Sequence, residues 1–314
     1  SYSSDVLTYI AEDQSIEADE ITPDINAVAD SITTSEDIAV DINVLVNDSF
    51  ITTAPITVTA ANGSNGSTAI IANIVSYSPN TDFNGTDTFS YTITQGGKTS
   101  SADVSVTIEA VNDAPSIDSA STIQVAENQT AVSTISVSDV DEDKLTLTLN
   151  GTDADSFDLS TDNVLTFKEA PDFETKSSYS ITLSLSDGEE TVDKDINIVI
   201  INVNDIAPEF TSEATFSAAE NQTAIGTVTA TDADDADGTT NIVTFSVSGN
   251  ELAVTQDGIL TFISAPDYET KSSYTATVTA SDGINATTQD ITVNVTNVND
   301  IAPEFTSEAT FSAA

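Results

Sequence analysis

The sequence contains no cysteine, histidine, methionine or tryptophan, and none of its basic residues is arginine. Without cysteine or histidine, the chain cannot form a thiolate nucleophile, a Ser-His-Asp triad, an imidazole base or a zinc site of the usual kind. It also has no disulfide framework. Any metal site in this chain must therefore use oxygen ligands, which favour hard divalent cations.

Positive charge is scarce as well: 6 lysines stand against 52 acidic residues, and the formal net charge is -46. A surface that follows a nucleic-acid backbone needs clustered Lys or Arg, as does binding to an anionic membrane, so both partners are excluded. We expect most carboxylates to be solvated surface groups, as in a protein adapted to salt water. Carboxylates that crowd together require inorganic cations, because arginine, the usual partner of a buried carboxylate, is missing.

Long apolar segments are also lacking. No stretch approaches the roughly 18 apolar residues of a membrane-spanning helix. The first residues, SYSSDVLTYIAEDQ, lack the basic and apolar regions of a signal peptide, so a secreted form is expected to be a mature or excised segment. With 314 residues the chain is long enough for two or three domains.

The sequence repeats itself. The segment NVNDIAPEFTSEATFSAA occurs at residues 202–219 and again at residues 297–314. Linker prolines at Pro115, Pro208 and Pro303 give a period of about 95 residues. The two units between these prolines align along most of their length, and residues 25–111 are a more distant copy of similar length. The chain is therefore predicted to be a tandem array.

Each repeat shows the alternation of β-strands. Ile181, Leu183 and Leu185 alternate with Ser and Thr, and residues 274–280 repeat this pattern one unit later. Thr and Val are common, turn residues recur at short intervals, and no segment has a helical period. The pattern predicts an all-β chain, with about seven short strands and one β-sandwich in each repeat.

Acidic residues recur at fixed places in each repeat. They follow the first strand (AENQT), the second strand (DxD), a proline (DFE or DYE), the penultimate strand (SDG) and the last strand (VND). Because a sandwich with an odd number of strands has its chain ends at opposite poles, one repeat and the next should contribute to the same junction. The set predicted at the second junction is Glu127, Asp172, Glu174, Asn204, Asp205, Asp232, Asp234 and Asp282.

Crowded carboxylates repel one another by roughly 1–4 kcal/mol per close pair at ~4–6 Å. Oxygen-coordinated divalent cations remove that cost, and each Ca²⁺ prefers about 6–8 oxygen ligands. Backbone carbonyls of Val203 and Ile206 are further candidate ligands. The sequence therefore predicts Ca²⁺ as the cofactor of these junctions.

These motifs resemble those of the cadherin family, over residues 113–300 in two full repeats. The resemblance implies cadherin-like, Ig-like Greek-key sandwiches, joined by short linkers in which several Ca²⁺ ions stiffen the array. The DRE triplet of the family is replaced by DFE and DYE, and the family's first linker acid is replaced by Asn202 and Asn297. The resemblance extends the ligand set of the last repeat to Glu220, Asp267, Glu269, Asn299 and Asp300.

The first repeat resembles the cadherin-like tandem domains of very large bacterial surface proteins. Glu36 stands in place of the AEN glutamate, and the DFE triplet is replaced by Asp82 and Asn84 around Phe83. Because Asn84 replaces a carboxylate, the first junction is expected to be weaker or to hold fewer ions. Its other predicted ligands are Asn112, Asp113, Asp139, Asp141 and Asp187.

Three alternatives compete with this interpretation. An EF-hand at residues 139–150 is disfavoured, because Lys144 replaces the loop glycine and Asn150 replaces the bidentate glutamate. A glycosidase needs one pair of catalytic carboxylates, whereas these acids recur at every junction, so no enzyme is predicted. A polysaccharide- or cell-surface-binding module stays open, because related bacterial repeats sometimes bind glycans.

The function predicted is an extracellular, calcium-rigidified structural rod, one segment of a large bacterial adhesin or surface filament. Its expected partners are further repeats or neighbouring copies, with cell-surface glycans or proteins as an alternative. The predicted domains are a segment 1–24, sandwiches at 25–112, 113–205 and 206–300, and a first strand at 301–314. That last strand is explained either by truncation of a longer array or by pairing with a neighbouring subunit in a filament, with Phe305 and Phe311 then buried.

Overall fold

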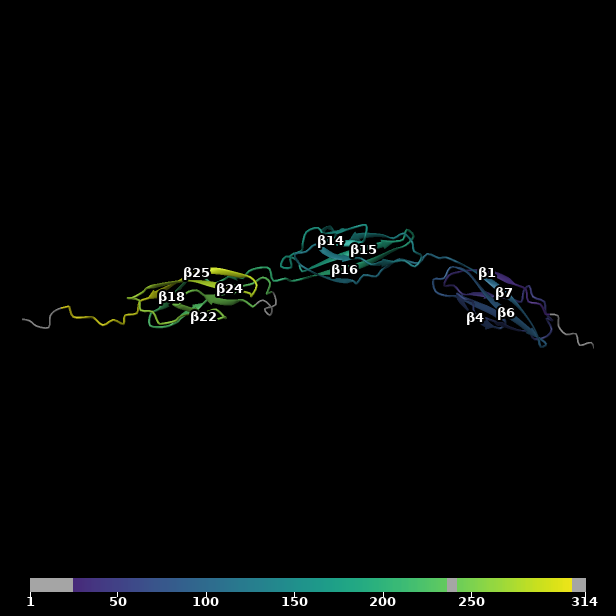
Figure 1. Ribbon diagram of the computed structural model, residues 1–314, viewed down its shortest axis with the longest axis horizontal. Helices are drawn as coiled ribbons and strands as arrows, with labels where there is room; N and C mark the ends of the chain where they lie inside the picture. Colours follow the sequence, from purple (N-terminus) through teal and green to yellow (C-terminus); the bar gives the residue numbers. More distant parts are fainter. Residues whose placement is uncertain (1–24, 236–241, 307–314) are drawn as a thin grey trace, which may run out of the picture. The chain divides into compact units, whose positions relative to one another are not determined.

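The computed structural model describes residues 25–235 and 242–306 (Figure 1). The predicted segments 1–24 and 307–314, with Phe311, lie outside the described residues, and the described part of the last segment, residues 301–306, forms no strand. The all-β prediction is confirmed: within the described ranges, the only helical element is a 3-10 turn, η1 (Ala154–Ser156). The chain divides into two compact units, of which the first contains Ser1–Ala114 together with Asp139–Lys144.

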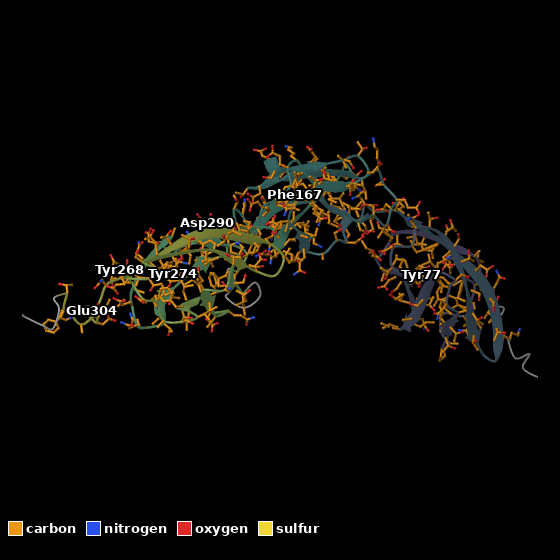
Figure 2. The ribbon with its side chains drawn as sticks, turned by 60° about the vertical axis from the view of Figure 1, so that its left-hand side comes forward. Tyr77, Phe167, Tyr268, Tyr274, Asp290 and Glu304 are labelled. Atoms are coloured by element: carbon orange, nitrogen blue, oxygen red, sulfur yellow. The ribbon has the colours of Figure 1, made fainter. Side chains whose placement is uncertain are left out.

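Two sheets form the sandwich of the first unit. One has the strand order β1-β7-β6-β3 and the other the order β2-β5-β4. Their strands are β1 (Asp30–Ser35), β2 (Val40–Ile42), β3 (Thr57–Ala60), β4 (Gly66–Ile71), β5 (Ile74–Pro79), β6 (Gly85–Gln95) and β7 (Lys98–Glu109). Alternate residues of β6, among them Phe89, Tyr91 and Ile93, are buried in the core between the sheets. Tyr77 of β5, labelled in Figure 2, stacks on Phe89 within it.

The second unit begins with a sandwich built on the sheet β12-β15-β16-β9. A three-stranded sheet, β10-β14-β13, faces it, and a short pair, β11-β8, completes it. The bounds are β8 (Ser116–Ile117), β9 (Thr122–Ala126), β10 (Ala131–Thr134), β11 (Val137–Ser138), β12 (Thr146–Asn150), β13 (Phe157–Leu159), β14 (Val164–Phe167), β15 (Ser178–Ser186) and β16 (Thr191–Ile201).

The same arrangement recurs in the rest of the second unit. The sheets are β18-β25-β24-β21, β19-β23-β22 and the pair β17-β20. The bounds are β17 (Glu209–Phe210), β18 (Thr215–Ala219), β19 (Ala224–Thr227), β20 (Ala230–Thr231), β21 (Thr244–Val247), β22 (Leu252–Val254), β23 (Ile259–Phe262), β24 (Ser273–Ser281) and β25 (Ala286–Thr296). The matching strand orders reflect the sequence repeat.

The period-two pattern predicted which residues enter the cores. Ile181, Leu183 and Leu185 of β15 are fully buried, and so are Ile196 and Ile198 of β16. In the following sandwich Val278, Ile291 and Val293 occupy the matching core. Alternation works here because successive side chains of a strand point to opposite faces of the sheet.

One feature of this topology positions the acidic residues. In each sandwich the first long strand pairs in parallel with the last one: β1 with β7, β9 with β16, and β18 with β25. The strands therefore finish side by side, and the residue after the first strand donates its N–H to the final residue of the last strand. These bonds are Glu36 to Glu109 (3.0 Å), Glu127 to Ile201 (3.2 Å) and Glu220 to Thr296 (3.2 Å). Each glutamate of the AEN type is thus fixed beside the start of the following linker.

Candidate metal centre

A buried glutamate anchors each linker. Glu36, Glu127 and Glu220 are only 3%, 4% and 3% exposed, although free carboxylates are rarely buried. Each accepts a hydrogen bond from a linker N–H: Val111 to Glu36 at 2.5 Å, Val203 to Glu127 at 2.7 Å and Val298 to Glu220 at 2.7 Å. Charge-assisted bonds of this kind compensate part of the desolvation of a carboxylate.

In the second unit the same glutamate also fixes the DFE loop. The N–H of Phe173 donates to Glu127 Oε2 at 2.8 Å, and the N–H of Tyr268 donates to Glu220 Oε2 at 2.8 Å. One side chain therefore holds the linker with one oxygen and the DFE or DYE loop with the other. This explains how residues about 75 positions apart in the sequence reach one place.

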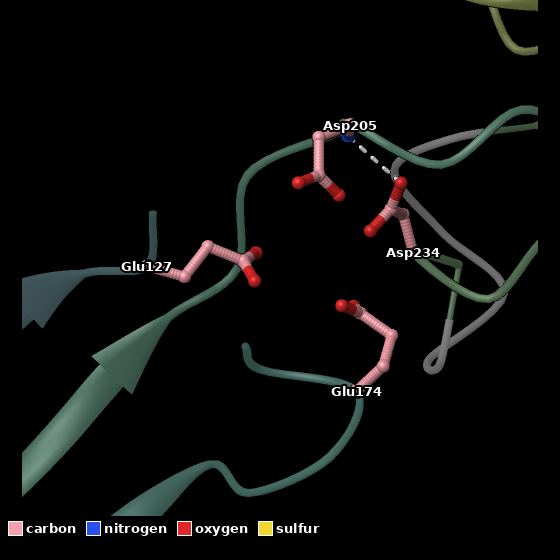
Figure 3. Close-up of side chains that lie close together, drawn as sticks. All are labelled: Glu127, Glu174, Asp205 and Asp234. Atoms are coloured by element: carbon pink, nitrogen blue, oxygen red, sulfur yellow. Dashed lines mark hydrogen bonds between the residues drawn. The ribbon is translucent and has the colours of Figure 1, made fainter. Parts of the chain in front are cut away.

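Four carboxylates converge in the second unit (Figure 3). Glu127, Glu174, Asp205 and Asp234 each place an oxygen within 4.8 Å of the others. Asp234 is 2% exposed, and its Oδ2 accepts the N–H groups of Asp205 (2.9 Å) and Ile206 (2.8 Å). Asp234 comes from the DxD motif of the following repeat, as the sequence pattern anticipates.

The electrostatic cost of this cluster is visible at Glu174. Burial raises the pKa of Glu174 to about 7, and the neighbouring carboxylates of Asp234 and Glu127 act in the same direction. Close carboxylates at an effective dielectric constant of about 20 repel by a few kcal/mol. Without a counter-charge, the folded chain therefore holds a proton at this position up to near-neutral pH.

A second group lies beside this cluster. Asp234 N–H donates to Asp232 Oδ1 at 2.9 Å, and burial, together with Asp282 and Asp234, raises the pKa of Asp232. Asp282 Oδ1 accepts the N–H groups of Ile284 and Asn285, which form the turn of the SDG motif. The Asn285 side chain in turn donates to Asn204 Oδ1 at 3.0 Å. The structure thus brings Asn204, Asp232 and Asp282 together around Asn285, an asparagine that the sequence interpretation missed.

The first unit has its own carboxylate groups. Glu36, Asp113 and Asp141 form one, and Asp37, Asp82 and Asp113 form another, each with oxygens within 4.8 Å of one another. As in the second unit, the DxD motif reaches the linker: Asp113 N–H donates to Asp141 Oδ2 at 2.8 Å, and Asp141 N–H to Asp139 Oδ1 at 2.9 Å. The pKa of Asp113 is raised, first by burial and then by repulsion from four neighbouring carboxylates, those of Asp82, Asp141, Glu36 and Asp37.

A further group lies at the last linker. Glu220, Glu269 and Asp300 are within the same 4.8 Å limit, and Asn297 Nδ2 donates to Glu269 Oε1 at 2.7 Å. Asn299 is exposed in this linker. Glu269 and Asp300 are exposed too, so the carboxylates of this group are more hydrated than those around Asp234.

Other predicted ligands are held by local turns. Asp172 accepts the N–H and the hydroxyl of Thr175, Asp267 accepts those of Thr270, and these bonds lower the pKa of both aspartates. Asp187 accepts the N–H groups of Glu189 and Glu190. Asn112 Nδ2 donates to the carbonyl of Asp113, while Asn84 is exposed. For these residues the role of cation ligand stays a prediction.

Sequence reasoning overlooked the residue after each buried glutamate. Asn128 Nδ2 donates to Asp205 Oδ2 at 2.5 Å, and Asn221 Nδ2 donates to Asp300 Oδ2 at 2.6 Å. In the first repeat Asp37 occupies this position. The signal was present in the AEN motif, whose asparagine recurs in both closely related repeats and is replaced by an acid in the first.

The donor set fits a hard divalent cation. All of its atoms are oxygens, mostly of carboxylates, and Asp113 Oδ2, Asp139 Oδ2 and Glu174 Oε1 are fully buried without accepting a hydrogen bond within the described ranges. The ion pairs found there, Lys176 with Asp153 and Lys271 with Glu251, involve none of the clustered acids. No lysine thus neutralises these groups in the described part of the chain.

Comparison with known proteins identifies the family. The sequence pattern of the bacterial Ig domain matches residues 19–107 and 112–199, together more than half of the chain. The chain belongs to the bacterial Ig domain family. The repeats of this bacterial Ig-domain chain are also cadherin-like, as predicted. Human Cadherin-23 is 30% identical over 186 residues, which cover 56% of the chain and 6% of the relative. The Drosophila melanogaster protocadherin-like wing polarity protein stan is 30% identical over 240 residues, 67% of the chain and 7% of the relative.

Solved cadherin structures share the fold of this bacterial Ig-domain chain. Protocadherin Gamma B2 extracellular cadherin domains 3–6 superpose with a TM-score of 0.53 at 21% identity, covering 89% of the chain and 74% of the structure. Mouse Cadherin-23 EC22–24 gives 0.51 at 19% identity, covering 88% and 99%. The chain spans less than a tenth of the curated relatives it matches. Within the described ranges, no helix has the length and apolarity of a membrane span.

Proposed function

We propose that this chain is a calcium-binding structural segment of an extracellular surface protein. Calcium held between one repeat and the next stiffens the array, so that the segment sets a distance between an anchor and a binding tip or a neighbouring subunit. The role is mechanical and not enzymatic. Further repeats of the same protein or neighbouring copies are its partners, in a bacterial adhesin or surface filament.

One observation carries the proposal: Glu127, Glu174, Asp205 and Asp234 meet within 4.8 Å although they come from two successive repeats. A solvated acidic surface has no reason to concentrate four carboxylates in one place, with Glu127 and Asp234 almost completely buried. These four residues would hold a cation, and Asn204, Asp232 and Asp282 would hold another. Bound Ca²⁺ supplies positive charge that offsets the repulsion and links the two repeats.

The residues themselves account for a coupling between calcium and order. Without a cation, repulsion among the four carboxylates opposes the approach of the Asp232 and Asp234 loop to the Asp205 linker. With the charges neutralised, the hydrogen bonds from Asp205 and Ile206 to Asp234 hold linker and loop together. Extracellular calcium modules bind with dissociation constants of ~10⁻⁴–10⁻³ M, so such a segment is ordered outside cells and loosened by chelator.

The test uses the full chain with calcium or with EDTA. Calcium should raise the melting temperature and narrow the distribution of radii of gyration in small-angle X-ray scattering. Sodium chloride at matched ionic strength is the control, because it screens exposed charges without coordinating them. Scattering profiles that are the same with calcium and with EDTA would contradict the proposal.

A second candidate function, binding of a glycan, is favoured by a pocket that recurs in the two closely related repeats. One cavity, of about 450 Å³, is lined by Pro171, Asp172, Thr175 and Tyr179, among others. The matching cavity, of about 370 Å³, is lined by Pro266, Asp267, Thr270 and Tyr274, of which Tyr274 is labelled in Figure 2. An aromatic ring beside fixed carboxylate and hydroxyl groups suits a sugar, which has apolar faces and many hydroxyls.

The two candidates differ in their dependence on calcium. Binding to a glycan array that survives EDTA and is lost in a Tyr179→Ala, Tyr274→Ala double variant supports the glycan module. Tyr77→Phe, a change at a buried tyrosine of the first unit, is the control. If the chain binds no glycan in either calcium or EDTA, only the structural role remains.

A further inference from the structure

The residue after each buried glutamate has the same unusual backbone conformation. Its φ angle is 58° at Asp37, 62° at Asn128 and 63° at Asn221. This left-handed region is sparsely populated by residues other than glycine, and Asn and Asp are the main exceptions. Because the backbone conformation is the same, the Cα–Cβ bonds of the three residues point in the same direction relative to the buried glutamate. What differs is the chemistry: an amide in the two later repeats and a carboxylate in the first.

This position reaches the aspartate of the linker. In the second unit the amides of Asn128 and Asn221 donate hydrogen bonds to the linker aspartates Asp205 and Asp300. Asp37 has no N–H in its side chain and cannot make the equivalent bond. Its carboxylate instead lies with those of Asp82 and Asp113, within 4.8 Å, and accepts the N–H of Asp82 at 3.2 Å. A favourable contact has thus been replaced by a like-charge contact.

A second position differs in the opposite sense. Where the later repeats carry Glu174 and Glu269, the first repeat carries Asn84, whose side chain is exposed. Compared with the second unit, the first unit therefore has a carboxylate in place of an amide at Asp37, and an amide in place of a carboxylate at Asn84. The two positions together therefore carry one carboxylate in either unit, and in the first unit this carboxylate belongs to Asp37.

Glu36 gives an independent indication that a ligand belongs here. It is 3% exposed, yet only one of its oxygens accepts a hydrogen bond within the described residues, from Val111. The N–H of Phe83, which would match the donors to Glu127 and Glu220, donates to the Asn80 carbonyl. Asp113 Oδ2 is fully buried and also accepts no hydrogen bond in the described part of the chain. A fully buried anionic oxygen without a donor, as at Asp113 Oδ2, is costly, and a cation is the partner that an oxygen ligand of this kind takes.

We propose that Asp37 is a calcium ligand specific to the first unit, where it takes the place of the glutamate that Asn84 replaces. The inference rests on the proposed function, since it assigns a further residue to the same class of site. Glu36, Asp37, Asp82, Asp113 and Asp141 then form the carboxylate set of the first unit. The substitution of Asn84 consequently relocates a ligand and does not remove one.

The test is a reciprocal exchange in the full chain. Asp37→Asn converts the first site to the residue found in the later repeats, and Asp103→Asn, at an exposed position of β7, is the control for loss of one charge. Hydrogen exchange, read at residues 111–113 and 203–205 during a calcium titration, reports the two sites separately. Asp37→Asn should raise the half-saturating calcium concentration at residues 111–113 by at least about tenfold, the usual minimum for disturbing a metal site. Residues 203–205 should not respond.

A rescue variant distinguishes a role of Asp37 as a calcium ligand from a role in the local turn alone. Asn84→Glu added to Asp37→Asn recreates the arrangement of the second unit and should restore the calcium response at residues 111–113. A shift no larger than that of Asp103→Asn overturns the assignment of Asp37 but leaves the proposed function intact, provided both sites of the unchanged chain respond to calcium. No calcium-dependent protection at either site of the unchanged chain overturns both.

Discussion

The first and second units surround the buried glutamate and the linker with different residues. In the second unit one glutamate uses both oxygens, holding Val203 and Phe173, and four carboxylates meet around it. In the first unit Glu36 holds only Val111, and the acids among the described residues form three overlapping groups, two of which share Asp113. The difference shows that the backbone frame is the constant part of the site, while the positions of the carboxylates around it vary.

The largest difference between the sites should follow from removing a linker aspartate. Asp205→Ala removes one of the four carboxylates of the second unit and should weaken calcium binding there by at least about tenfold, with the first unit unaffected. Hydrogen exchange at residues 203–206 and 111–113 during a calcium titration measures this. Asp193→Ala, at an exposed position of β16, is the matched control. Equal weakening in both units would show that the ligands are wrongly assigned.

Replacing the buried glutamates tests their unequal hydrogen bonding. In Glu127→Gln only one side-chain oxygen remains, so either Phe173 or Val203 loses its acceptor, at a cost of about 1–3 kcal/mol in local opening free energy. Glu36→Gln can keep its single bond to Val111 and should cost less. Amide hydrogen exchange in EDTA gives both values. A larger loss of local opening free energy in Glu36→Gln than in Glu127→Gln would contradict this prediction.

The raised pKa of Glu174 predicts a pH dependence in the absence of calcium. Its ordinary value is 4.5 and its value in the folded chain is about 7, so the folded state holds a proton that the unfolded state releases. The stabilisation is complete below about pH 4.5 and is lost as the pH rises through 7, by about 3 kcal/mol in all. Melting of the full chain in EDTA, compared with Glu174→Gln, measures it. A pH profile that Glu174→Gln leaves unchanged in this interval would exclude Glu174 as the source.

The smallest expected effect concerns the asparagine beside the second site. Asn285→Ala removes the bond to Asn204 and should lower local protection of residues 203–205 by about 0.5–1.5 kcal/mol. Glu190 stands at the matching place of the preceding repeat, so Glu190→Ala is the natural comparison. An equal loss of protection at residues 203–205 in both variants would show that the Asn285 bond contributes nothing specific.

The sequence was sufficient for the strands and for most of the clustered acids. Alternation at Ile181, Leu183 and Leu185 defined a core strand because burial on one face imposes a period of two. Repetition of the acidic motifs brought Glu127, Glu174, Asp205 and Asp234 into one predicted set, since a recurring topology returns the same positions to the same place. These predictions depend only on periodicity.

What the sequence did not reveal depends on local backbone conformation. The role of Asp37 follows from a left-handed φ angle that directs the side chain at the linker, and periodicity carries no information about that angle. Asp172 was grouped with Glu174, yet its carboxylate turns to Thr175, because a neighbouring N–H and hydroxyl are the nearest donors. Asn285 was missed because only the turn after Asp282 aims it at Asn204.

The parallel pairing of β1 with β7, and of its counterparts β9 with β16 and β18 with β25, has a mechanical consequence. Tension along the chain pulls the start of the first strand and the end of the last strand in opposite directions. Between parallel neighbours this is a shearing load, so the inter-strand hydrogen bonds resist together and do not open one after another. Each of these parallel pairs would therefore resist a stretching force by shear along its whole length.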